Sequence, residues 1–209
     1  MAKRFTLYGI PGSAPSYKAA LMLALSQEPY RYVFVDFAKR ENRTPDFLAK
    51  SRYGEVPCLL DGELAICQSA AIVLHLAETL GKFDGQSIEE KVRIREWMFW
   101  DFDRLMPNLS RALAIKDGFW SPHQSLVDEY KLEGDVGLKR LERWLAKHDW
   151  LVGGRPTAAD IEIYGIVHFA PRAGFDFAQT SKVAAWGKRI ETLPGFATAD
   201  ALLTNESRP

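Results

Sequence analysis

Cysteine is scarce in this chain, since only Cys58 and Cys67 occur among its 209 residues. Two cysteines are too few for the disulfide framework of a small secreted domain, and neither they nor the four histidines show a metal-binding spacing. We therefore expect two buried thiols in a reducing compartment, and no bound metal ion.

An excess of charge is also missing, because 27 Lys and Arg residues balance 27 Asp and Glu residues. The two parts of the chain on either side of residue 80 are each close to neutral as well. A neutral chain has no electrostatic basis for binding a nucleic-acid backbone or an anionic membrane surface. Neither kind of partner is expected.

Long hydrophobic runs are absent too. No apolar stretch has the length needed to cross a bilayer, and residues 1–8 alternate like a strand instead of forming the apolar core of a secretory signal. The motifs of phosphate-binding loops, serine hydrolases and zinc proteases do not occur. Together these absences predict a cytoplasmic protein.

The residues that are present predict two domains of different character. The composition, 47% hydrophobic and 26% charged, is that of a folded protein, and all six Trp residues lie after residue 80. Residues 4–8 and 30–37 are rich in aromatic and β-branched side chains, with an apolar helical pattern at residues 18–27 between them. This order predicts a βαβ unit with parallel strands.

The remainder of the first domain predicts a short helix after Thr44, a hairpin over residues 56–66 with an Asp-Gly turn, and a helix that Ser69 caps. Residues 81–87 look like a linker. After the linker only helices are expected, with starts near Ser87, Ser125, Thr157 and Ser181, and the first of them runs to Lys116. The fold class is therefore an α/β domain over residues 1–80 followed by an all-α domain over residues 88–209.

Three junctions of the first domain combine an element end with residues suited to ligand binding. The loop Gly9–Ser16 places hydroxyl groups before a helix, where a negative charge is favoured. Gln68 and Ser69 form either a plain N-cap or a site whose N–H groups hold a carboxylate. Pro57 either marks an edge strand or bulge, where a missing backbone N–H is tolerated, or is a cis-proline that turns a backbone amide toward a ligand.

Taken in order, these motifs resemble the cytosolic glutathione transferases, and in particular bacterial serine-type members near the phi, theta and nu classes. The resemblance covers nearly the whole chain and is strongest over residues 5–80. The segments that carry it are Leu7-Tyr8-Gly9, Ser13 to Lys18, Arg43 to Leu48, Gly54 to Pro57, Gln68 to Ile72 and Thr157 to Ile161. It implies a thioredoxin-like first domain, an all-helical second domain, and glutathione as co-substrate.

The resemblance also implies roles for single residues. Val56 would offer its backbone to the cysteinyl part of glutathione, with Pro57 in the cis form. The γ-glutamyl carboxylate would be held by the pair that opens the later helix, and the glycine carboxylate would lie near a polar pair before Thr44. The implied glutathione-binding residues are Ser13, Asn42, Arg43, Glu55, Val56, Pro57, Gln68 and Ser69. Thr157 and Asp160 match a capping box that serves folding of the helical domain.

The hydroxyl that faces the sulfur is implied to be Ser13. Tyr8 is an alternative, because other classes of the family use a tyrosine at the end of the first strand, although a strand tyrosine also packs its ring. Ser16 is a second alternative, but its place before the first helix favours the N-cap position. With Ser16 as the cap, Ser13 is expected to be free to approach the sulfur.

Glu55 departs from the family pattern, in which Lys or Gln often precedes the Val-Pro pair. A carboxylate there is expected to repel the glycine end of glutathione and to weaken binding, unless Arg43 or Arg52 offsets it. The acceptor substrate is expected between the Gly9–Ser13 loop and the helix after Ser87. Its implied lining is Ile10, Phe99, Phe102, Asp103 and Met106, although the last four could equally form a core face.

The implied function is a homodimeric transferase that joins the glutathione thiolate to an electrophilic, largely apolar small molecule. Alternatives on the same scaffold are a glutathione-dependent disulfide reductase, a dehalogenase or an isomerase. Serine instead of cysteine at positions 13 and 16 argues against thiol transfer. A non-catalytic binding module is the remaining alternative, and Glu55 is the feature that suggests it.

Overall fold

The computed structural model describes residues 3–208, and the chain divides into two compact units. The first unit combines Met1–Lys82 with Leu193–Pro209, and the second runs from Phe83 to Thr192. The boundary after Lys82 therefore lies within the expected linker, residues 81–87.

The first unit is built on a four-stranded sheet in the order β2-β1-β3-β4. Its strands are β1 (Phe5–Gly9), β2 (Tyr30–Phe34), β3 (Cys58–Asp61) and β4 (Leu64–Cys67). β1 pairs in parallel with β2 and antiparallel with β3, and β3 continues into β4 through a tight turn at Gly62. The predicted βαβ unit and hairpin are thus confirmed, although β2 ends at Phe34 instead of near residue 37.

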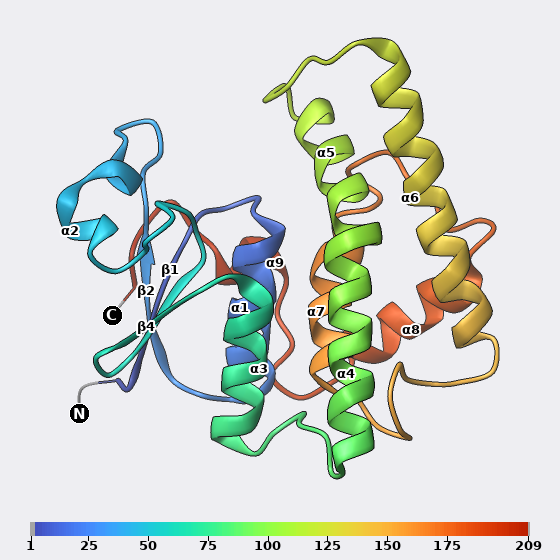
Figure 1. Ribbon diagram of the computed structural model, residues 1–209, viewed down its shortest axis with the longest axis horizontal. Coiled ribbons are helices and arrows are strands. Elements are labelled where there is room, and N and C mark those ends of the chain that lie inside the picture. Colours follow the sequence, from blue (N-terminus) through green and yellow to red (C-terminus); the bar gives the residue numbers. More distant parts are fainter. Residues whose placement is uncertain (1–2, 209) are drawn as a thin grey trace. The chain divides into compact units, whose positions relative to one another are not determined.

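Helices cover both faces of this sheet. On one face lie α1 (Ala14–Leu25) and α3 (Ser69–Leu80), which pack against each other, and on the other lies the short α2 (Pro45–Leu48), as Figure 1 shows. The α1 and α3 side contains most of the apolar core of the unit, where Phe5 and Leu7 of β1 are fully buried. The Thr44 hydroxyl accepts from the Phe47 N–H, so the predicted N-cap of α2 is confirmed.

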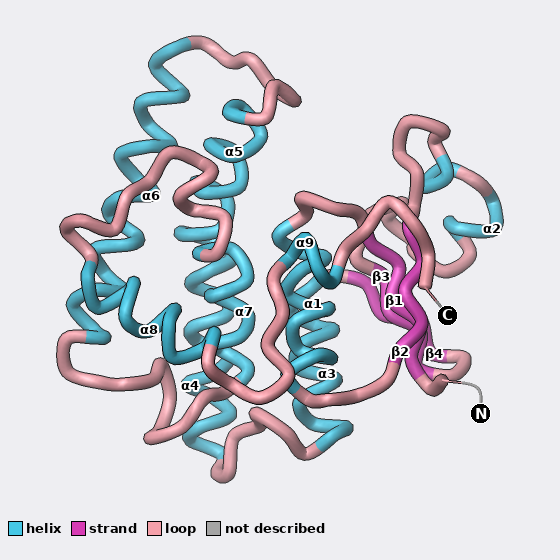
Figure 2. Tube along the Cα trace, turned by 180° about the vertical axis from the view of Figure 1, so that it is seen from behind, coloured by secondary structure: helices cyan, strands magenta, loops and turns pink. Residues whose placement is uncertain are grey.

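The end of the chain belongs to the first unit and not to the helical domain in which the sequence places it. The helix α9 (Ala199–Leu202) packs on α1, and a bridge joins Tyr32 of β2 to Arg208 (Figure 2). The Tyr17 hydroxyl of α1 donates to the Ala197 carbonyl over 3.0 Å. The last residues therefore cover one side of α1 and add a bridge to the sheet at its β2 edge.

The second unit consists of helices: α4 (Ile88–Trp100), a π-helical segment (Asp101–Leu105), α5 (Met106–Lys116), α6 (Gln124–Leu145), α7 (Ala158–Val167) and α8 (Ser181–Glu191). Every residue of α7 is buried, and this helix contacts α4, α5 and α8. A helix that is buried on every side, as α7 is, lies in the centre of such a unit, and its two acidic residues, Asp160 and Glu162, are buried with it. The predicted capping box of Thr157 and Asp160 opens it.

One expected helix is interrupted. The sequence predicts a continuous α-helix from Ser87 to Lys116, but Asp101–Leu105 forms the π-helical segment between α4 and α5. A π turn adds a residue to the turn and shifts the side chains that follow it to a different face. Buried Asp101 and Leu105 lie in this segment, whereas Phe102 between them is exposed.

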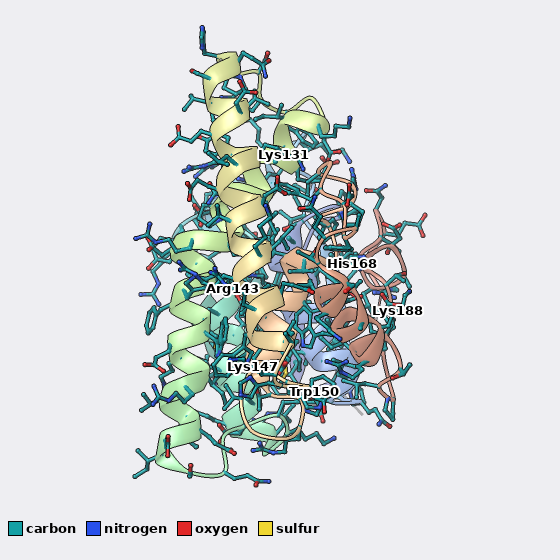
Figure 3. The ribbon with its side chains drawn as sticks, turned by 90° about the vertical axis from the view of Figure 1, so that its right-hand side faces the viewer. Lys131, Arg143, Lys147, Trp150, His168 and Lys188 are labelled. Carbon is teal, nitrogen blue, oxygen red and sulfur yellow. The ribbon has the colours of Figure 1, made fainter. Side chains whose placement is uncertain are left out.

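A polar hollow of about 330 Å³ lies in the second unit between α6 and the loop that precedes α8. Lys131 crosses its upper end, where the ammonium group donates to the Gly174 carbonyl over 2.7 Å and lies 3.8 Å from the centre of the Phe175 ring. Figure 3 shows Lys131 on α6, with Arg143 further along the same helix and Lys147 just beyond its end. Lys131 thus ties the loop to the helix.

Among residues 3–208, no helix has both the length and the hydrophobicity to cross a membrane.

Candidate functional site

The loop after β1 places Ser13 at the start of α1. The Ser13 hydroxyl oxygen accepts a hydrogen bond from the Ser16 backbone N–H over 3.2 Å, so Ser13 is the N-cap of this helix. The sequence expectation assigned this role to Ser16. The helix begins one turn earlier than expected because Pro15 falls in its first turn, where the fixed φ of proline is favourable.

Ser16 lies inside the first unit instead. Its side chain is fully buried, and its hydroxyl lies 3.3 Å from the position that a Cβ on Gly9 would occupy. No hydrogen-bond partner for this hydroxyl occurs in the part of the chain that the structure describes. Ser13, by contrast, is only half-buried, and the cap uses its oxygen as an acceptor. Its hydroxyl proton therefore remains available for donation to a ligand.

Tyr8 points to the other face of the sheet from its neighbour Leu7. Its ring packs edge-on against Phe47 of α2, with 5.9 Å between the ring centres. It lines an open hollow of about 210 Å³ together with residues of β2 and α2 and with Lys50. Burial raises the pKa of Tyr8. These contacts support the packing interpretation of this tyrosine.

The peptide bond between Val56 and Pro57 is cis, in agreement with the resemblance. Within residues 3–208 the Val56 backbone has no hydrogen-bond partner, and the residue is half-buried. The segment before it is held tightly, because the Ser51 hydroxyl accepts from the Glu55 N–H over 3.2 Å and donates to the Glu55 carbonyl over 2.8 Å. A fixed and unpartnered backbone is suited to pairing with the backbone of a peptide ligand.

Asn42 and Arg43 lie against the same segment. The Asn42 amide is buried and donates to the Gly54 carbonyl over 2.9 Å, so this side chain holds the segment before Val56 in place from the protein interior. Gly54 has a φ of +63°, and a Cβ there would lie 2.7 Å from the nearest Arg43 guanidinium nitrogen. Arg43 is exposed. Of the two, Arg43 has the side chain that can reach a ligand carboxylate.

The second half of the site opens α3. Gln68 is the N-cap residue with a φ of +73°, and Ser69 is the first helical residue, so the helix starts one residue before the expected position. The Gln68 side chain does not cap the helix. The first turn contains no acidic residue. The N–H groups at the start of the helix and the positive end of the helix dipole can therefore hold a carboxylate.

The hairpin brings these two halves together. Cys58, which follows Pro57, is paired directly with Cys67, which precedes Gln68. The Gln68 side-chain amide accordingly lies 3.4 Å from a carboxylate oxygen of Glu55. Both thiols are free and buried, as the sequence predicts, and burial, together with Cys67 beside it, raises the pKa of the Cys58 thiol to about 12.

The predicted acceptor pocket remains a prediction. Ile10 is half-buried in the first unit. In the second unit, Phe99 and Phe102 are 73% and 56% exposed, and these two rings are therefore not part of a core face. Asp103 forms an ion pair of 2.7 Å with Arg104, and Met106 begins α5 after the π-helical segment. Residues 3–208 contain no group of three or more side chains placed to bind a metal ion.

The N-terminal domain model of the glutathione S-transferases matches residues 3–78, and their C-terminal domain model matches residues 102–194. The chain belongs to the glutathione S-transferase family. Its fold is that of the family, with a thioredoxin-like first unit and a helical second unit.

Relatives within the glutathione S-transferase family carry different activities in their names. The chain is 29% identical over 194 residues to the disulfide-bond oxidoreductase YfcG of Escherichia coli, covering 90% of this chain and 89% of that protein. It is 30% identical over 208 residues to a maleylacetoacetate isomerase of Rhizobium meliloti, covering 95% and 97%. The structure of Ure2p in complex with glutathione has a TM-score of 0.87 and 25% identity, covering 96% and 98%.

Proposed function

We propose that this chain binds glutathione in its first unit and transfers the glutathione sulfur to an electrophilic, largely apolar small molecule. The thiolate sulfur forms a bond to the electrophilic carbon. In a substitution the leaving group departs with the bonding electron pair, and in an addition the neighbouring atom takes up a proton. Because Ure2p, with the same fold, has been solved with glutathione, glutathione is also the expected ligand here.

The observation that carries the proposal is the Ser13 hydroxyl at the N-terminus of α1. A free cysteine thiol has a pKa of about 8.5, so it is mostly protonated at neutral pH. The Ser16 N–H already occupies an acceptor position of the Ser13 oxygen, which leaves the hydroxyl proton to point toward a sulfur. A hydrogen bond from this proton and the positive end of the helix dipole both favour the thiolate.

In this proposal each of the other parts of glutathione also has a partner in the first unit. The cysteinyl backbone would pair with the unpartnered backbone of Val56. The γ-glutamyl carboxylate would bind at the start of α3, near Gln68 and Ser69. Arg43 would reach the glycine carboxylate, while Asn42 keeps the intervening loop in place. Each part of the tripeptide would thus have its own partner in the chain.

The test is the pH dependence of thiolate absorbance for bound glutathione. Ser13→Ala should raise the pKa of the bound thiol by about one to two, because a hydrogen bond to a charged group is worth about 1.5–3 kcal/mol. Ser13→Gly should do the same while preserving most of the capping stability, since glycine is a tolerable N-cap. Ser16→Ala is the matched control and should leave the titration in place.

The assignment of the thiolate to Ser13 is refuted if neither Ser13 variant shifts the titration, or if Tyr8→Phe shifts it as much. Retention of the wild-type chain on a glutathione resin tests ligand binding separately. A chain that flows through the resin and shows no binding heat would be a module without this ligand.

A glutathione-dependent disulfide reductase is the second candidate, because the YfcG relative is named for that chemistry. The chain's own thiols are poor nucleophiles, since Cys58 is fully buried with a pKa of about 12. A reduction would therefore use the thiol of glutathione. Rates with an aryl halide, a mixed disulfide of glutathione and a cis-unsaturated dicarboxylate separate transferase, reductase and isomerase activity.

The oligomeric state, location and role of the enzyme are also proposed: we expect a homodimer in the cytoplasm that detoxifies electrophiles. The exposed apolar residues Ile88, Val92 and Phe99 on one side of α4 are consistent with a surface that needs a partner or a substrate.

A further inference from the structure

The charge of Glu55 lies at a different end of the site from the one that its sequence position suggests. The sequence expectation directs this carboxylate at the glycine end of glutathione. In the structure a carboxylate oxygen of Glu55 lies 3.4 Å from the side-chain amide of Gln68, at the start of α3. This is the end that receives the γ-glutamyl group in the proposed function.

The backbone of Glu55 is fixed, which restricts where its side chain can lie. Ser51 binds both the N–H and the carbonyl of Glu55, and the register of the hairpin pairs Cys58 with Cys67. Continued by one residue, this register places Pro57 opposite Gln68, and the contact between the Glu55 carboxylate and the Gln68 amide shows that the Glu55 side chain reaches the same end of the hairpin. The Gln68 backbone, with its positive φ, turns the Gln68 side chain away from the helix cap and toward Glu55.

The Glu55 carboxylate is also not neutralised by the chain itself. Within residues 3–208 it forms no ion pair, and its side chain is exposed. Neither of the two arginines that could offset it forms an ion pair with it. The Arg43 guanidinium lies against the neighbouring Gly54, and the Arg52 guanidinium lies 5.7 Å from the centre of the Tyr53 ring. A negative charge therefore remains available at the edge of the site.

The γ-glutamyl end of glutathione carries a charge that this carboxylate complements. That end is a free α-amino acid, in which a carboxylate and an ammonium group sit on the same carbon atom. When the start of α3 holds the carboxylate, the ammonium group lies within a few ångströms of it. The positive end of the helix dipole repels this ammonium group, so binding needs a nearby acceptor with a negative charge.

We propose that Glu55, oriented by Gln68, accepts a hydrogen bond from the α-ammonium group of the γ-glutamyl residue and selects thiols with a free α-amino-acid end. This inference rests on the proposed function, because it assigns a role within the same glutathione site. It reverses the sequence expectation, since Glu55 then strengthens binding instead of weakening it.

Calorimetry with three thiols tests the inference. The first is glutathione, and the second is γ-glutamylcysteine, which lacks the glycine. The third is glutaryl-cysteinylglycine, which keeps the γ-glutamyl carboxylate and lacks only the ammonium group. The variant is Glu55→Gln, and the matched control is Glu63→Gln, which removes an exposed carboxylate in the turn between β3 and β4.

Wild-type chain should bind glutaryl-cysteinylglycine about five-fold more weakly than glutathione, as expected for one partly exposed charged hydrogen bond. Glu55→Gln should weaken glutathione and γ-glutamylcysteine by about the same factor and should leave the deaminated thiol nearly unchanged. Glu63→Gln should behave like wild type with all three thiols.

Two results overturn the inference alone. One is glutathione binding that depends neither on Glu55 nor on the ammonium group. The other is tighter binding of glutathione by Glu55→Gln with no change for γ-glutamylcysteine, which would direct the carboxylate at the glycine end. A wild-type chain that binds none of the three thiols would overturn the proposed function as well.

Discussion

Replacing Asp160 should reveal how strongly the start of α7 holds the helical unit together. One carboxylate oxygen accepts from the Leu151 N–H over 3.0 Å and from the Trp186 indole N–H over 2.9 Å. The other accepts from the N–H and the hydroxyl of Thr157 over 2.9 and 3.0 Å. Burial raises the pKa of Asp160, but the four groups that bond to it, from three residues, are all donors and so favour the ionised form.

Asp160→Asn keeps the size of the side chain and removes half of its accepting capacity. If the new NH₂ group faces Leu151 and Trp186, two buried donors lose their acceptor, whereas if it faces Thr157, the hydroxyl can turn to accept from it and only the Thr157 N–H is left unsatisfied. The amide should take the second orientation, and because each buried donor left unsatisfied costs about 1–3 kcal/mol, the variant should lose about 1–3 kcal/mol of stability. This is a substantial part of the roughly 5–15 kcal/mol that stabilises an ordinary folded protein.

The measurement is urea unfolding followed by tryptophan fluorescence. The matched control is Asp149→Asn, because the Asp149 side chain is 84% exposed and only approaches Arg189 at 4.0 Å. The control should change stability by less than about 0.5 kcal/mol. A loss below about 1 kcal/mol for Asp160→Asn, with an unchanged denaturant slope, would refute the reasoning, because the Thr157 N–H would then have found another acceptor.

Three further predictions concern the rest of the chain. The pKa of Asp61 is lowered, first by the hydrogen bond from Arg4 and also by His75. The ionised Asp61 therefore stabilises the folded state fully above about pH 3.9, and this stabilisation is lost as the pH falls through the lower folded-state pKa. Asp61→Asn should flatten this part of an acid-unfolding curve measured by circular dichroism, and an unchanged curve would contradict the assignment. Cys58 and Cys67 should react with an aromatic disulfide reagent only as fast as the first unit opens, whereas immediate reaction of both would show that they are accessible. Light scattering should give twice the mass of one chain, and a monomer at micromolar concentration that still conjugates glutathione would rule out an obligate dimer.

Much of the fold could be predicted because its signals are local. The strand alternation, the Asp-Gly turn and the caps of α2 and α7 each depend on a few neighbouring residues, and each has the predicted form. The packing of Leu193 onward against α1 has no such signal, since it depends on contacts with Tyr17 and Tyr32 that are distant in sequence. The π-helical segment is equally hidden, because one extra residue in a turn leaves the helical pattern on either side intact.

The misassigned cap of α1 has a similar cause. Ser13 and Ser16 are both suitable caps by residue type, and composition does not distinguish them. Pro15 is the signal that could have decided the question. Proline is favoured in the first turn of a helix, which makes Ser13 the residue just outside it.

The candidate site is predictable in its residues and less so in their roles, because the roles depend on the register of one hairpin. A strand that slips by one residue exchanges its two faces, so the pairing of Cys58 with Cys67 determines which side chains meet. With this pairing, the unpartnered backbone of Val56 and the first turn of α3 lie next to each other, and Glu55 contacts Gln68. From sequence, Glu55 is an unexpected negative charge directly before the Val56-Pro57 pair. Its partner in the folded chain makes it a group that can recognise a positive charge on the ligand.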